Sequence, residues 1–118
     1  MDEIAEALHT YWNSFEVPAY PENSIPDNAK LPYIVYRVQK GEMFETMTDY
    51  VQIFDDGLNT ERIIGIAKQI TASIGLSKRI NINSGHIILR GIRWQIRKDT
   101  EENSVANYGD FSIEYNTK

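Results

Sequence analysis

Few side chains in this chain could do chemistry, and their spacing matches no catalytic motif. The two histidines, His9 and His86, stand far apart, and neither has a partner at metal-ligand spacing. Asp55 and Asp56 are adjacent acids, but the following Gly57 makes them typical of a strand-ending turn. The absence of cysteine excludes a disulfide framework, a thiolate metal site and a cysteine nucleophile. Phosphate-binding glycine loops and a nucleophile elbow are also absent, so we expect no enzyme, cofactor or metal.

Charge, in contrast, is unevenly spread along the chain. The 118 residues carry 17 acids and 12 bases, for a net charge of −5. Residues 78–98 contain six bases and no acid, whereas residues 1–36 and 99–118 are acidic. This basic hairpin either pairs with acids of its own chain or meets an acidic surface on another molecule. The candidate interface residues are Arg90, Arg93, Arg97, Lys98, Glu3 and Glu6.

Trp94 lies within this basic segment and could suggest a nucleic-acid site, because aromatic rings interleaved with arginines stack on bases. In an extended strand, however, Trp94 points to the opposite face from Arg93 and Arg97. The three side chains then form no single stacking surface. We therefore expect Trp94 to lie in the core or in a protein interface.

Two amphipathic helices are expected to position these residues. In residues 2–15 apolar side chains recur at steps of three and four. Residues 61–74 carry an apolar stripe of helical period and end at Gly75, a natural stop. Gly65 inside this helix costs about 1 kcal/mol relative to Ala, and we expect close packing against a strand to explain it. Residues 17–32 hold all 4 prolines and should form an extended, turn-rich connection.

Alternating apolar residues predict five strands, and a break in the alternation at Gly91 predicts a bulge. The strands cover residues 33–39, 44–54, 79–83, 86–98 and 111–115. Residues 99–110 are almost entirely polar and are expected to form a long loop. The order helix-strand-strand-helix-strand-strand-strand predicts one α+β domain over residues 1–118. Its small, mostly antiparallel (mixed) sheet would have four to five strands, with both helices on one face.

The composition is that of a soluble globule, with 42% apolar and 25% charged residues. Apolar runs reach only three or four residues, far short of the roughly 20 that span a bilayer. The acidic start is unlike the basic beginning of a signal peptide. We expect a protein that contacts no membrane and is not exported.

Taken together, the pattern resembles the tail terminator proteins of long-tailed bacteriophages, also called tail-completion or head–tail joining proteins. The similarity spans most of the chain and rests on apolar and aromatic patterns. Its features are the first helix, a Pro-rich run ending in Leu31-Pro32-Tyr33-Ile34-Val35-Tyr36, the strand Tyr50-Val51-Gln52-Ile53-Phe54, a helix with Ile66-Ala67, the Trp94 strand, a polar loop, and a closing Phe111–Tyr115 strand followed by Asn116.

The resemblance implies a homo-oligomeric ring, usually a hexamer, that caps the tail tube, stops its polymerisation and offers a surface to the head-completion or connector protein. Such a subunit is made in the bacterial host cytoplasm and ends in the virion, at the tail–neck junction. A head-to-tail ring needs complementary subunit edges, which the basic hairpin and the acidic ends could supply. DNA would pass through without being specifically bound, so we expect Glu101, Glu102 and Asn103 in a loop that faces the lumen or the tail.

Three alternatives stay open. Another phage neck component, such as a head-closure or minor capsid protein, shares this size and composition, and gene order beside a tail-tube gene would separate the two. A small nucleic-acid-binding module using residues 78–98 would show steeply salt-dependent DNA binding. The negative net charge of the whole chain disfavours this alternative. An enzyme would need a set of catalytic groups that the sequence does not show.

Overall fold

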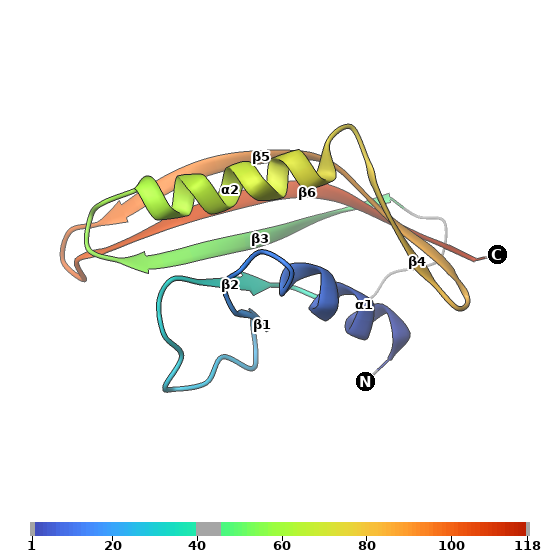
Figure 1. Ribbon diagram of the computed structural model, residues 1–118, viewed down its shortest axis with the longest axis horizontal. Coiled ribbons are helices and arrows are strands. Elements are labelled where there is room, and N and C mark those ends of the chain that lie inside the picture. Colours follow the sequence, from blue (N-terminus) through green and yellow to red (C-terminus); the bar gives the residue numbers. More distant parts are fainter. Residues whose placement is uncertain (1, 40–45, 118) are drawn as a thin grey trace.

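The computed structural model describes residues 2–39 and 46–117. These residues form a six-stranded mixed sheet with two helices on one of its faces (Figure 1). Within the described ranges only β1 and β2 pair in parallel, and the other neighbouring strands are antiparallel. The order across the sheet is β1-β2-β3-β6-β5-β4. The elements are α1 (Glu3–Trp12), β1 (Ala19–Pro21), β2 (Tyr33–Tyr36), β3 (Thr46–Asp56), α2 (Glu61–Ile74), β4 (Lys78–Ile82), β5 (Gly85–Asp99) and β6 (Ser104–Thr117).

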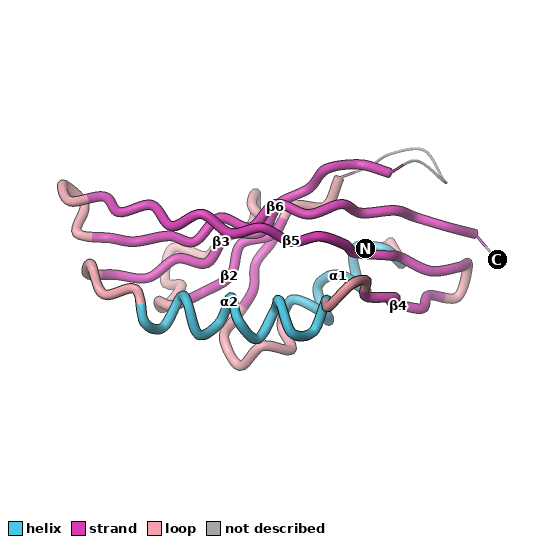
Figure 2. Tube along the Cα trace, turned by 90° about the horizontal axis from the view of Figure 1, so that it is seen from above, coloured by secondary structure: helices cyan, strands magenta, loops and turns pink. Residues whose placement is uncertain are grey.

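The core lies between the helices and the sheet face that they cover (Figure 2). The apolar stripe of α2 is buried there, which confirms the predicted helical face. The Trp12 ring of α1 packs 5.7 Å from the Phe111 ring of β6. A hydrogen bond of 2.8 Å between the hydroxyl groups of Tyr11 and Ser73 joins the two helices. The predicted α+β class and the shared helix face are therefore confirmed.

The sheet has six strands, whereas the sequence predicts four to five. The added strand, β1, forms inside the Pro-rich segment that we expected to be a connection. Pro18 accepts a hydrogen bond from the Ile34 amide at 2.8 Å, so a proline carbonyl begins the pairing with β2. On the outer side, the Asn13 side chain accepts from the Ala19 amide at 2.9 Å. Proline is compatible with such an edge strand because only one side of the strand pairs with a neighbour, so a missing backbone amide on the other side breaks no strand hydrogen bond.

The prediction of a long loop over residues 99–110 is wrong. Residues 104–110 form the first half of β6, and a turn of residues 100–103 closes the β5–β6 hairpin. Polar residues continue the strand here because β3 and β5 pair with it on both sides. Val105 and Asn107 are buried at the centre of the sheet. The polar composition therefore reflects a paired strand, whose backbone groups are satisfied by its neighbours.

Of the two glycines that the sequence analysis singled out, Gly91 has the expected role and Gly65 does not. The predicted bulge is confirmed, since the β5–β6 register shifts between Arg90 and Arg93 and Gly91 has a φ of 66°. Gly65 does not pack closely, because a Cβ added there would meet nothing within 4 Å. The close approach occurs instead at Gly109, where the Trp94 ring lies against the backbone.

Within residues 2–39 and 46–117, no helix has both the length and the apolar character needed to cross a membrane.

Candidate functional site

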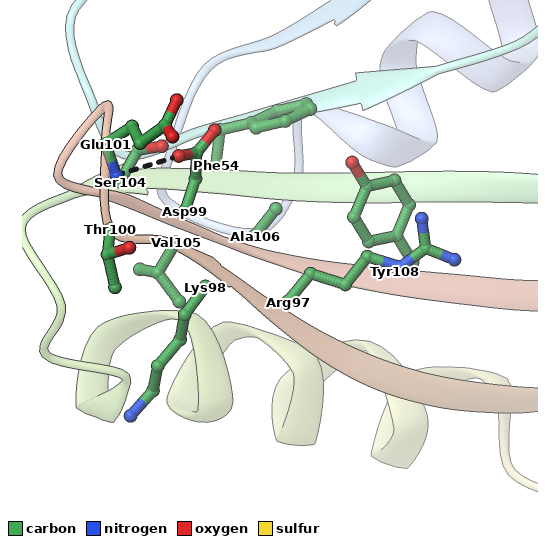
Figure 3. Close-up of a pocket in the computed structure, with 10 residues that line it drawn as sticks. All are labelled: Phe54, Arg97, Lys98, Asp99, Thr100, Glu101, Ser104, Val105, Ala106 and Tyr108. Carbon is green, nitrogen blue, oxygen red and sulfur yellow. Dashed lines mark hydrogen bonds between the residues drawn. The ribbon is translucent and has the colours of Figure 1, made fainter.

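A row of aromatic rings crosses the face of the sheet that the helices leave uncovered. It begins at Tyr20 on β1, continues through Tyr33 on β2 and Phe54 on β3, and reaches Tyr108 on β6. Successive ring centroids lie 5.8, 5.9 and 6.3 Å apart, in edge-on or tilted contact. The Arg97 guanidinium carbon lies 4.5 Å from the centre of the Tyr108 ring, which extends the row onto β5 (Figure 3). We call this uncovered surface the open face.

The strand register aligns this row. Tyr33 stands directly opposite Phe54, and Tyr108 is the diagonal neighbour of Phe54 because it pairs with Gln52. Each ring is half-buried by its neighbours. Such edge-on contacts contribute about 0.5–1.5 kcal/mol per pair beyond buried area. The rings are thus held in place before any partner arrives.

A second cluster surrounds Arg37 near the end of β2. Its guanidinium carbon lies 4.3 Å from the centre of the Tyr50 ring, and its Nε donates to Asp49 Oδ1 at 2.9 Å. The Asp49 side chain is completely buried, and its Oδ2 has no hydrogen-bond partner among the described residues. Burial raises the pKa of Asp49, although the hydrogen bond from Arg37 opposes that effect. Tyr50 donates to Glu22, and this bond raises the pKa of Tyr50.

The predicted basic hairpin divides between two faces. Arg90, Arg93 and Arg97 lie on the open face, where Arg93 stands opposite Asp110 of β6. Arg90 Nη2 lies 3.8 Å from Glu114 Oε2, so part of the basic charge meets acids of the same chain. Lys98 points to the other side, toward α2 (Figure 3). The four basic candidates therefore do not form one patch.

The two predicted acids of the first helix lie on the helix side of the sheet. Glu3 accepts from the Ser84 amide at 3.2 Å and from the Ser84 hydroxyl at 2.6 Å. This contact ties α1 to the β4–β5 turn. Glu6 is exposed on the same helix. Within one chain, the structure keeps these acids apart from the arginines of the open face.

Glu101, Glu102 and Asn103 form the tip of the β5–β6 hairpin, all of them exposed. Asp99 Oδ1 accepts from the Glu101 and Glu102 amides at 3.1 Å each. The Asn103 carbonyl accepts from the Gly57 amide at 2.7 Å, which links the tip to the end of β3. The predicted long loop is therefore a short turn with fixed hydrogen bonds.

On the helix side, an apolar groove of about 560 Å³ runs between α2 and β5. Trp94 lines this groove and donates from Nε1 to Thr71 Oγ1 at 2.8 Å. This placement confirms that Trp94 and the arginines occupy opposite faces. The groove is lined by Ile64, Ala67, Lys68, Thr71, Ala72, Trp94, Ile96 and Asn107.

Sequence reasoning missed both the aromatic row and the groove. The alternation within each strand predicts which face a ring occupies, but the row depends on the register between strands distant in sequence. The groove depends on the position of α2 across β5. The alternation of Trp94 with Ile96 was the local signal for it.

Among the described residues, no group of three or more His, Asp or Glu is placed to hold a metal ion. No family model, curated protein or solved structure matches the chain. The geometry itself offers two surfaces of the kind that contact macromolecules: an aromatic and arginine-bearing open face, and an apolar groove beside a sheet edge.

Proposed function

We propose that the chain is a structural subunit of a bacteriophage tail, a tail terminator that forms a ring on the tail tube. The observation that carries the proposal is the open face, which extends across the sheet and is covered by neither α1 nor α2, the helices of the described residues (Figure 2). Half-buried aromatic rings and arginines line this face. These residue types are enriched where proteins bury surface against each other.

Rigidity supports the same role. The rings already contact one another, so binding through the open face costs little side-chain ordering. Each ring is flanked by β-structure, so the face is a preformed platform. A subunit that must stack on a regular tube needs such a surface.

The sheet also has two unlike edges, β1 at one side and β5 with β4 at the other. Contact between unlike edges is head-to-tail, and it closes into a ring when the rotation between copies allows. The hexamer is the number that the resemblance implies. In this arrangement Arg90, Arg93 and Arg97 meet acids at the β1 edge of the next copy. The acidic hairpin tip, Glu101 and Glu102 with Asn103, faces the lumen or the tail, where it would not grip DNA.

Tube growth in the presence of the chain tests this proposal. Tail-tube protein is polymerised with and without the purified chain, and tube lengths are measured by electron microscopy. We expect growth to stop and tube ends to be capped. Unaltered tube lengths with bare ends contradict the proposal, and binding to connectors but not to tubes identifies another neck component.

Charge reversal on the open face provides a matched comparison. Arg93→Glu with Arg97→Glu should abolish capping, because both side chains then repel the acids of the next copy. Lys78→Glu, on the helix side of β4, changes charge away from that face and should leave capping intact. Equal capping by both variants removes the role assigned to the arginines.

A second candidate function is favoured by one observation, the stacking of Arg97 on the Tyr108 ring within an aromatic row. Nucleic-acid platforms use the same residue types. Acids on the open face oppose it, since Asp110 stands opposite Arg93 and Glu114 lies near Arg90. Titration with single-stranded DNA separates the two functions. Tight binding that weakens steeply with salt supports a nucleic-acid module, whereas no binding at low salt rejects it.

A further inference from the structure

Half of β5 is a free sheet edge. β4 pairs with Gly85–Leu89 only, so among the described residues the stretch from Arg90 to Asp99 has β6 as its one strand neighbour. This stretch forms the upper margin of the sheet in Figure 1, and its outward backbone amides and carbonyls have no strand partner within the described ranges. Such an edge is a template for an added strand.

Side chains alternate along this edge between the two faces of the sheet. Trp94 and Ile96 line the groove on the helix side, and Lys98 points to the same side (Figure 3). Arg93 and Asp99 carry opposite charges at the two ends of the run, and neither forms an ion pair within residues 2–39 and 46–117. The side chains on the open face are those of Arg93, Gln95, Arg97 and Asp99.

The free edge can pair with the same edge of a second copy. A two-fold axis between the copies brings the strand against itself in the antiparallel direction. The same alternate residues of each copy turn their amides outward, so hydrogen bonds form only when one residue lies at the axis, opposite its own equivalent. Each choice of this central residue sets a different register, and the charges along the edge distinguish the registers.

The register with Ile96 at the axis is complementary in charge. Arg93 of each copy then stands opposite Asp99 of the other, so two pairs of opposite charge form on the open face. On the helix side the two Ile96 side chains meet, and Lys98 stands opposite Trp94, where its alkyl stem covers apolar surface beside the groove. Opposite charges directly facing each other stabilise a sheet.

The neighbouring registers lack this complementarity. With Gln95 at the axis, Arg93 stands opposite Arg97 twice. With Arg97 or Lys98 at the axis, a positive charge faces its own equivalent. With Trp94 at the axis, no opposite charges face each other. Because like charges directly opposite are destabilising, the basic side chains that exclude these registers leave the one centred on Ile96.

We propose that the free chain forms a two-fold pair through this edge, with Ile96 opposite Ile96 and Arg93 opposite Asp99 in a ladder of residues 93–99. The six-stranded sheet of one copy then continues into that of the other. This pairing goes beyond the proposed ring and does not depend on it. A further step does rest on the proposed function: because the ring uses the same edge, pair and ring exclude each other, and the pair masks the edge until the chain meets a tail tube.

Single cysteines test the register, because the chain has none of its own. The test variant is Ile96→Cys, and the matched controls are Gln95→Cys and Arg97→Cys, which are also exposed on the same strand. Facing Cα atoms of antiparallel strands lie about 4.5–5.5 Å apart, which a disulfide spans, whereas equivalent residues away from the axis lie beyond its reach. On mild oxidation we expect Ile96→Cys to give on the order of tenfold more covalent dimer than either control.

Charge changes give a second readout, the dissociation constant of the dimer by sedimentation equilibrium. Arg93→Glu sets an acid opposite Asp99 in both copies and should weaken the dimer on the order of tenfold. Asp99→Asn in the same chain should restore most of the affinity, because it removes this repulsion and keeps the oxygen that accepts from two amides of the hairpin tip. Lys30→Glu makes the same change of charge at an exposed residue of the β1–β2 connection, near the opposite sheet edge, and should leave the constant unchanged (Figure 1).

A chain that stays monomeric at its highest soluble concentration overturns the inference, as does stronger crosslinking at residue 95 or 97 than at residue 96. Preferential crosslinking of Ile96→Cys to an added Leu58→Cys or Ile25→Cys chain also overturns it, because a different segment then occupies the edge. These measurements use the purified chain alone, so their failure leaves the ring proposal standing.

The masking role is tested with tail tubes. The oxidised Ile96→Cys dimer should not cap tubes, and its reduction should restore capping. Capping by the oxidised dimer overturns the masking role. Absence of capping in both forms overturns the tail function and leaves the pair standing.

Discussion

Gly109→Ala tests whether the Trp94 ring is placed as the structure shows. A Cβ at residue 109 would lie 2.7 Å from Trp94 Cζ3 and 2.9 Å from both Cε3 and Cη2. Carbon atoms normally approach to about 3.5–4.0 Å, so the ring would have to move by about 1 Å. The hydrogen bond from Trp94 to Thr71 resists that movement. Overpacking of this type costs about 1–3 kcal/mol, which lowers the Tm of a domain this size by roughly 4–12 °C.

Urea unfolding and a thermal melt measure the effect. Gly65→Ala is the matched control, because a Cβ there meets nothing within 4 Å. Within a helix it should add about 0.5–1 kcal/mol of stability. The two glycine-to-alanine changes should therefore act in opposite directions.

The same substitution in a Trp94→Ala background isolates the cause. With the ring removed, Gly109→Ala should be nearly neutral, so the double-mutant cycle should show strong coupling. Equal destabilisation with and without the Trp94 ring would refute this reasoning, as would full stability of Gly109→Ala alone.

Two further predictions concern buried acids. Arg62→Ala should destabilise the fold by about 1–3 kcal/mol, because it leaves buried Asp55 without its two guanidinium hydrogen bonds of 2.7 and 2.9 Å. Chemical denaturation measures this loss of unfolding free energy. An unchanged unfolding free energy would show that the Arg62–Asp55 pair is not formed in solution. Asp49→Asn should change the pH dependence of stability. Because burial raises the pKa of Asp49 above its ordinary value, the folded state binds the proton more tightly, and the resulting stability is present at low pH and lost as the pH rises through the raised pKa. The wild type should thus gain stability relative to Asp49→Asn between pH 7 and pH 4 in urea unfolding, and a relative loss would contradict the assigned direction.

Local periodicity was enough to predict parts of this fold. The helix at residues 61–74 follows from its apolar stripe, and the bulge follows from the broken alternation at Gly91. The opposite facing of Trp94 and Arg97 follows from the two-residue period of a strand. Each of these features depends on residues close together in sequence.

Features that depend on distant partners were not predictable in the same way. β1 forms among prolines because β2 and the Asn13 side chain supply its hydrogen bonds. The first half of β6 is polar, and its strand structure comes from pairing with β3 and β5. We expected a close approach at Gly65, but it occurs at Gly109, where the Trp94 ring lies against the backbone. The register between β5 and β6 sets Gly109 opposite Trp94, and this register depends on strand pairing that the local sequence does not show.

Cryo-electron microscopy of tail-tube ends incubated with the chain tests the central claim most directly. We predict a closed ring of subunits at one end of each tube, with the open face of each copy in contact with a neighbour. Tube ends without added density, or the chain bound as scattered single copies, would contradict it.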